Sequence, residues 1–298
     1  MQNRSRSAER RVHRSRASAT AVGTGGDTVL IPVKLCNLPP FHAVITKLLS
    51  LSEANRFDVR RIVAIVEGDP ALAAEILFIS NSSFFGFPAR VQSLSHAVAL
   101  LGTDCVRQLA MTVAMRELAR GAGPFVRSCW CHSVACALIA DKLAPIFGCS
   151  LEQAYTAGLL HDVGRLGFLR SYPSEISPVF AAEYEDVDQV IAEERRVMNA
   201  SHGEAGAWLI EYWTLPVGLR DTCAQHHDEL QETDSPILQV IKIACRLADA
   251  TGYSAVRFTS QADYQETLQS VAPHVAKHAL PSEEAVRTEV ESRLSVFR

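Results

Sequence analysis

Histidine and aspartate side chains recur along the second half of the chain, at positions that helical periodicity would turn inward. The apolar residues around them repeat at three- and four-residue intervals, which is the pattern of amphipathic helices. Buried ionisable groups are costly unless they pair with one another or bind a metal ion. The pattern therefore predicts five helices packed around one shared polar cluster, formed by His132, His161, Asp162, His202, His226, His227 and Asp249.

The first members of this cluster can be placed on local elements. His132 lies on one stripe with Cys129 and Cys136, so a helix here would turn the imidazole toward the core. His161 follows a nearly charge-free helical segment, and we expect Gly164 to end that helix. Both histidines are therefore expected to be buried.

Capping signals mark two helix starts. Ser201 and Glu204 have the spacing of a capping box, so His202 should open a helix. Asp69 followed by Pro70 is typical of an N-cap with proline at the first helical position. Helices are thus predicted in both halves of the chain, and no strand-like alternation of any length is present.

The chemistry of the cluster favours a divalent metal. Imidazole nitrogens and carboxylate oxygens suit Fe, Mn, Zn or Mg, and the set is large enough for one or two ions. A second interpretation is a hydrogen-bonded core network without metal. A zinc site at Cys129-x-Cys131-His132 is a third, but the two cysteines point to different sides of a helix and no second CxxC follows.

Composition limits the class of protein. The chain has 298 residues, is 48% hydrophobic and carries a net charge of −4, so it can bury a large core and has no overall nucleic-acid signature. Its apolar runs are short, and the N-terminus has no apolar signal segment, so neither a membrane span nor secretion is expected. Several of the eight cysteines fall on predicted core faces, which indicates reduced thiols and a cytoplasmic protein.

Four segments are expected along the chain. Residues 1–27 contain six Arg and one Glu and are predicted to be a disordered basic tail, solvated or in contact with nucleic acid or acidic lipid. Residues 28–123 form an N-terminal helical subdomain, and 124–256 form a helical bundle that holds the cluster. Residues 257–298 add a C-terminal helical extension.

The order of these residues resembles the HD superfamily of metal-dependent phosphohydrolases, whose pattern is His, His-Asp and Asp. The HD-GYP branch adds a His and a His-His pair, which match His202 and His226-His227. The first half is similar to the HDOD family, the HD-related output domains, in Asp69-Pro70-Ala71-Leu72, Ser80-Asn81-Ser82, Ser93 to His96, Leu100-Leu101-Gly102 and Trp213-Thr214-Leu215-Pro216. This resemblance implies an all-α fold, namely an HD-type helical bundle with an N-terminal helical subdomain.

The sequence departs from the catalytic branches. The stretch after His226-His227 has no Gly-Tyr-Pro motif, the Lys usual after HDxG is Arg165, and position 128 is Ser where some HD-GYP proteins have Glu. The resemblance therefore implies a regulatory module of bacterial signal transduction, not an enzyme. It would act through a signalling protein partner, and it could also bind a nucleotide.

The alternative that the resemblance implies is a metal-dependent phosphohydrolase. Asp162 would bridge two ions, and Arg165 would stabilise phosphate charge. One metal would then be held by His132, His161, Asp162 and Asp249, and the other by Asp162, His202, His226 and His227.

Overall fold

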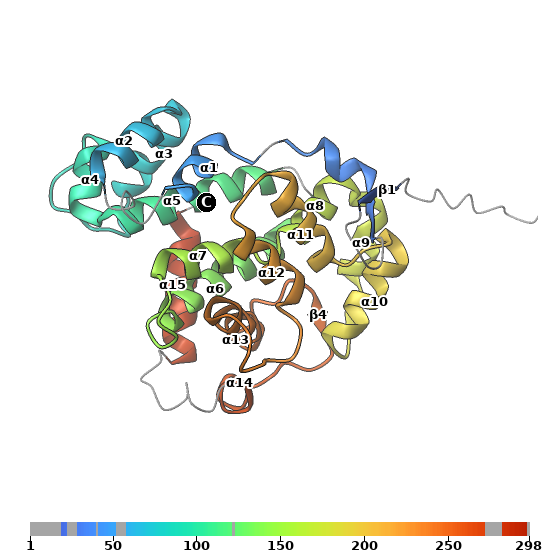
Figure 1. Cartoon of the computed structure of the whole chain (residues 1–298). Helices are drawn as coiled ribbons and strands as arrows, with labels where there is room; N and C mark the ends of the chain where they lie inside the picture. The colour runs from blue at the N-terminus through green and yellow to red at the C-terminus, as the bar shows by residue number, and fades with distance from the viewer. Residues whose placement is uncertain are drawn as a thin grey trace, which may run out of the picture.

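The computed structural model describes residues 19–22, 29–39, 41–51, 58–120, 123–271 and 282–296. Helices account for nearly all regular structure in these ranges, which confirms the all-α prediction (Figure 1). Within them, no single helix is long and apolar enough to cross a membrane. The bent pair Leu94–Leu101 and Thr103–Ala119, at 117°, passes that test only when its two helices are counted together.

Five N-terminal helices lie at one end of the molecule. Asp69 starts one of them, because its Oδ1 accepts hydrogen bonds from the backbone N–H groups of Ala71 and Leu72, both at 2.9 Å, and Pro70 follows as the first helical residue. The capping prediction is therefore confirmed. The helices are α1 (Ala43–Leu49), α2 (Val59–Glu67), α3 (Pro70–Ser80), α4 (Leu94–Leu101) and α5 (Thr103–Ala119).

A central bundle of six helices holds the polar cluster. Helix α6 packs against α7 and α13, while α11 packs against α8 and α12. Gly158 allows the first of these contacts, because a Cβ there would meet the backbone of Ala137 at 2.7 Å. The members are α6 (Val126–Leu143), α7 (Leu151–Leu160), α8 (Val163–Ser171), α11 (His202–Tyr212), α12 (Val217–Gln225) and α13 (Pro236–Ala250).

The N-terminal helices share one core with the central bundle. Helix α5 packs against α7, and α2, α3 and α4 pack around α5 (Figure 1). A buried ion pair between Arg107 of α5 and Glu152 of α7 crosses the same contact. The apolar core is continuous between the N-terminal helices and the central bundle. The boundary that the sequence predicts between two subdomains near residue 124 therefore stays a prediction.

Peripheral elements close the sides of the bundle. Helix α15 returns onto α6, where Lys142 pairs with Glu289 at 3.3 Å, so the C-terminal segment is part of the packed body. The short strands β3 (Glu183–Tyr184) and β4 (Arg257–Phe258) pair in parallel. The remaining elements are η1 (Val33–Asn37), α9 (Pro173–Ala181), α10 (Val187–Met198), α14 (Tyr264–Val271) and α15 (Glu283–Val296).

Two local expectations were wrong. Residues 19–22 were assigned to the basic tail, but they form β1 (Ala19–Val22), which pairs antiparallel with β2 (Val29–Pro32). The rest of the predicted tail lies outside the described residues. Gly164 does not end a helix: it lies inside α8, where a Cβ would collide with the backbone oxygen of His202, so its role is close packing of α8 on α11.

Candidate metal centre

Asp162 lies at the middle of the cluster, at the break between two helices. His161 is the C-cap of α7 and Asp162 is the N-cap of α8, so the two neighbouring side chains leave the chain where its direction changes. Both are completely buried. This break therefore places an imidazole and a carboxylate side by side in the core.

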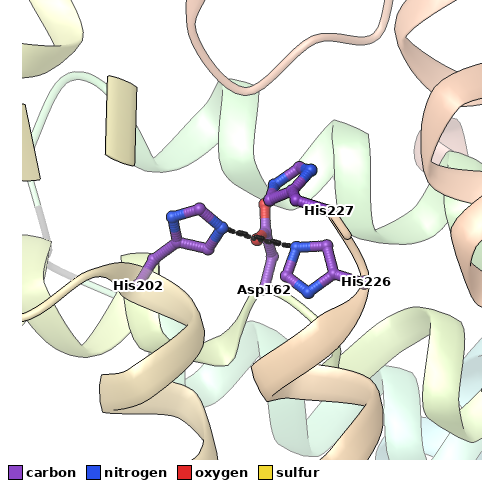
Figure 2. Close-up of side chains that lie close together, drawn as sticks. All are labelled: Asp162, His202, His226 and His227. Atoms are coloured by element: carbon purple, nitrogen blue, oxygen red, sulfur yellow. Dashed lines mark hydrogen bonds and ion pairs between the residues drawn. The ribbon is translucent and has the colours of Figure 1, made fainter. Parts of the chain in front are cut away.

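One group of potential ligands surrounds one oxygen of Asp162. Its Oδ1 lies 3.5 Å from Nε2 of His202 and 3.4 Å from Nε2 of His226 (Figure 2). His227 completes this group, in which one ligand atom from each residue lies within 4.8 Å of the others. Residues of α8, α11 and the end of α12 thus converge on one position that suits a cation.

A second group lies on the other side of the same carboxylate. Nε2 of His132 is 3.1 Å from Nε2 of His161, 3.6 Å from Sγ of Cys245 and 3.7 Å from Oδ2 of Asp162. His132, His161 and Cys245 also satisfy the 4.8 Å grouping. Asp162 therefore presents one oxygen to each group.

The outer nitrogens of the histidines fix which ring atom faces inward. Nδ1 of His132 and His161 lie 2.9 and 2.6 Å from the carbonyls of Tyr253 and Gly158. A carbonyl only accepts, so each Nδ1 must carry the proton. Each inner Nε2 of a neutral ring then presents a lone pair.

The same arrangement holds in the other ligand group. Nδ1 of His226 donates to the carbonyl of Cys223 at 2.9 Å, and Nδ1 of His202 donates to Glu194 at 2.6 Å. The inner Nε2 atoms of His202 and His226 are 3.4 Å apart. Two facing lone pairs repel each other, so a metal ion between the rings, or a proton on one ring of each pair, satisfies these short Nε2 contacts.

Buried polar atoms without hydrogen-bond partners also mark the centre. Oδ1 of Asp162 and Nε2 of His227 are such atoms among the described residues. An unsatisfied buried carboxylate oxygen or imidazole nitrogen is costly, and a metal ion would satisfy both. The residues present therefore fit a divalent metal.

Burial sets the protonation states that a metal requires. It lowers the pKa of His161 and His227 well below the usual value, and that of His226 below it. Burial alone would raise the pKa of Asp162, but Arg165 and His161 hold it well below its usual range. Neutral imidazoles around an ionised carboxylate are the ligand forms that bind metal near neutral pH.

Arg165 is enclosed between two carboxylates. Its Nη1 lies 2.7 Å from Oδ2 of Asp162, and its Nε lies 3.6 Å from Oε1 of Glu194. Burial alone would lower the pKa of Arg165, but Asp162 and Glu194 raise it above the usual value. Glu194, from α10, was missed by the sequence analysis, since it lies in the charged run Glu193 to Arg196, which is typical of a solvated face.

Asp249 does not join either ligand group. Its carboxylate lies 3.3 Å from Nδ1 of His132, on the outer side of the ring, and its side chain is 27% exposed. Asp249 raises the pKa of His132 against the opposing effect of burial.

Cys245, one turn earlier on α13, lies at the inner side of the His132 ring instead, next to Nε2. The cysteines of the alternative zinc site, Cys129 and Cys131, belong to neither group of described residues.

Comparisons with known proteins agree with this architecture. The HDOD domain profile matches residues 38–229. An uncharacterized protein of Treponema pallidum is 23% identical over 269 residues, which cover 89% of this chain, and the chain spans about half of that relative's length.

Three solved structures have the same fold. An HDOD domain protein of unknown function from Geobacter sulfurreducens is 24% identical with a TM-score of 0.70, covering 89% of this chain and 96% of that one. A candidate phosphohydrolase from Shewanella amazonensis is 20% identical with a TM-score of 0.61, covering 89% and 94%. A candidate signal transduction protein from Marinobacter aquaeolei is 21% identical with a TM-score of 0.64, covering 87% and 59%. At these identities the likeness shows the fold alone.

Proposed function

The chain belongs to the HDOD family, and on that premise we propose that it is a regulatory module of signal transduction built around a closed divalent-metal centre. In this proposal the metal holds the central bundle in one arrangement, and partner proteins recognise that arrangement. The burial of five potential ligands is the single observation that carries the proposal.

Burial of the inner ligands supports a regulatory role over a catalytic one. His132, His161, Asp162, His202 and His226 are each no more than 1% exposed. A phosphoester would need an open coordination position and room beside the metal. Arg165, the cation expected to bind phosphate, is itself buried and engaged by Asp162. A bound metal would therefore act on the fold more directly than on a substrate.

The ligand groups divide by donor type. His132, His161 and Cys245 offer nitrogen and sulfur, a combination that suits zinc. Asp162 with the three remaining histidines offers nitrogen and oxygen, which suits iron, manganese or zinc. When bound, such an ion supplies positive charge that neutralises the carboxylate and fixes the inward-facing imidazoles. The protein's own contribution is the set of outer hydrogen bonds that hold the rings in place.

Helix α7 offers a route from the metal centre to a partner surface. It ends next to His161, its C-cap, and packs against α5, around which the other N-terminal helices are arranged. Those helices expose apolar side chains, including Phe78 at 75% exposed and Leu100 at 44%. A partner that covered these side chains would bury apolar surface, which stabilises a complex. A shift of α7 on metal binding would therefore move a surface suited to a protein partner.

A second candidate, a metal-dependent phosphohydrolase, is favoured by one observation. Asp162 presents its two oxygens to two separate ligand groups, as a carboxylate that bridges two metal ions would. In that case Arg165 would have to leave Asp162 to reach a phosphate.

Two measurements on one preparation separate the candidates. Hydrogen exchange of residues 58–120 should change between metal-free and metal-loaded protein, because the regulatory proposal requires that the two states differ there. Hydrolysis of bis(p-nitrophenyl) phosphate by the loaded protein should not exceed that of an Asp162→Ala control. Metal-dependent turnover that is lost in this variant, with identical exchange in both states, would favour the phosphohydrolase.

A further inference from the structure

His227 differs from the other histidines of the metal centre in what holds its ring. The other four are each fixed through Nδ1, by a backbone carbonyl or by Glu194. The His227 ring lies beside those of His202 and His226 (Figure 2), and its Nε2 is buried without a hydrogen-bond partner among the described residues. The position of this imidazole therefore depends strongly on its backbone.

The backbone of His227 belongs to a loop between two helices. Helix α12 ends at Gln225 and α13 begins at Pro236, so residues 226–235 connect them. The N–H of Asp228 still donates to the carbonyl of Gln225 at 3.0 Å, but the chain then leaves the helix. Since a loop has no helical hydrogen bonds of its own, contacts from elsewhere must hold it in one conformation.

One face of α13 supplies such contacts. Gln239, Lys242 and Arg246 are three and four residues apart, so they lie on the same face of the helix. Nζ of the buried Lys242 donates to the carbonyl of Glu229 at 2.8 Å and pairs with the carboxylate of Asp234 at 2.7 Å. Nε2 of Gln239 donates to the carbonyl of Asp234 at 2.9 Å. The far part of the loop is thus tied to α13.

Arg246 holds the part of the loop that carries the ligand. Its Nη2 donates to the carbonyl of Asp228 at 2.9 Å and lies 3.5 Å from the carbonyl of His227. Its Nη1 donates to the carbonyl of Lys242 at 3.2 Å, within the same helix, which fixes the plane of the guanidinium. A guanidinium carries several donors in a rigid fork, so one side chain can hold neighbouring carbonyls.

We propose that Arg246 is a positioning residue for His227. It fixes the backbone from which this imidazole extends, and so it sets the metal affinity of the ligand group that contains His227. The inference rests on the proposed metal centre. Helix α13 then serves both ligand groups, because Cys245, the neighbour of Arg246 in sequence, lies beside His132 in the other group.

Removal of the guanidinium tests the assignment. Arg246→Met keeps an apolar stem without a donor, so it should weaken binding of the Zn²⁺ ion that also responds to His227→Ala. The expected loss is at least about tenfold, the usual effect of losing an outer partner of a ligand. Competition between the full chain and a fluorescent chelator measures this affinity. Arg246→Lys keeps a charged donor and should recover most of it. Arg220→Met is the matched control, since Arg220 pairs with Glu211 and Asp221 at the surface.

Combination with His227→Ala separates positioning from a general effect on the fold. If Arg246 acts through His227, adding Arg246→Met to His227→Ala should change the zinc affinity by less than about twofold. A merely structural role would weaken zinc binding equally in both backgrounds. Arg246→Gln, whose amide is too short to hold both carbonyls, replaces Arg246→Met if that variant does not fold.

The outcomes distinguish this inference from the metal centre itself. Wild-type zinc affinity in the Arg246 variant, or a further tenfold loss in the double variant, would overturn the role of Arg246 and leave the metal centre in place. Wild-type protein that binds no zinc would overturn both.

Discussion

Glu194 accepts two hydrogen bonds from His202, one from the backbone N–H at 2.8 Å and one from Nδ1 at 2.6 Å. The same carboxylate lies 3.6 Å from Nε of Arg165. Burial alone would raise the pKa of Glu194, but His202 and Arg165 hold it below its usual value, so it stays ionised. A buried carboxylate from α10 thus fixes the tautomer of a ligand on α11 and the position of the cation on α8.

Replacing Glu194 should weaken metal binding without removing a ligand. In Glu194→Gln the charge that orients the His202 ring is lost, and changes to such outer partners typically cost about 10–100-fold in metal affinity. Competition with a fluorescent chelator measures this change. Glu193→Gln is the matched control, since Glu193 pairs with Arg196 at the surface. Equal affinities in the two variants would show that Glu194 does not support the centre.

Asp162 should be the most sensitive ligand position. It faces both groups, so Asp162→Ala should abolish binding at both, whereas His161→Ala removes a ligand from one group and His227→Ala from the other. A metal ion held by the group that contains His132 and His161 should therefore survive His227→Ala better than His161→Ala. In metal-free protein, Asp162→Ala should cost about 1–3 kcal/mol by leaving imidazoles and Arg165 without their carboxylate. Equal metal loss in all three variants would contradict this order.

Acid should destabilise the metal-free protein. Burial lowers the pKa of His161, His226 and His227, so the unfolded state takes up their protons first as pH falls through about 6.5. Their contribution to stability is complete above that unfolded pKa and is lost as pH falls toward the folded values. His132, whose pKa is raised, changes the free energy of unfolding in the opposite direction. The combined contribution of the other three histidines is expected to be larger than that of His132.

Urea unfolding at a series of pH values checks the sign. The free energy of unfolding should fall between about pH 7 and pH 5, and metal affinity should fall over the same range because protons compete for Nε2. A free energy of unfolding that rises on acidification would contradict the assigned protonation states.

Gly164 should be essential for packing, unlike Gly218. A Cβ at Gly164 would collide with the backbone of His202 and would meet the backbone nitrogen of Gly206 at 2.7 Å. Gly164→Ala should therefore cost at least about 1–3 kcal/mol of stability and should displace His202. Gly218→Ala should be neutral or stabilising, because its Cβ enters open space within a helix. Thermal unfolding of both variants makes the comparison, and similar melting temperatures would show that α8 and α11 can separate at no cost.

Structural features that depend on residues within one helix turn, such as helix caps, could be predicted from the sequence. Asp69 and Ser201 cap the helices that they were expected to cap, because a cap depends only on residues two or three positions away. The inward position of His132 and His202 followed from apolar periodicity, and the structure buries both. The structure brings the five histidines and Asp162 close together, whereas Asp249 stays on the outer side of His132.

Features set by tertiary contacts could not be predicted. Glu194 looks solvated in the sequence, and only the tertiary fold places its side chain against Arg165 and His202. Cys245 and Asp249 are one turn apart on α13, so periodicity alone could not decide which of them faces the inner side of His132. Gly164 is typical of a helix end, and its real role depends on an approach by the backbone of His202.

Metal content of the full chain tests the central claim most directly. Protein purified without chelator and without a metal-affinity column should contain one or two equivalents of iron, manganese or zinc by plasma mass spectrometry. Asp162→Ala prepared in parallel should contain none. Wild-type protein that lacks metal, and that gains neither bound metal nor thermal stability when these ions are added, would contradict a metal centre.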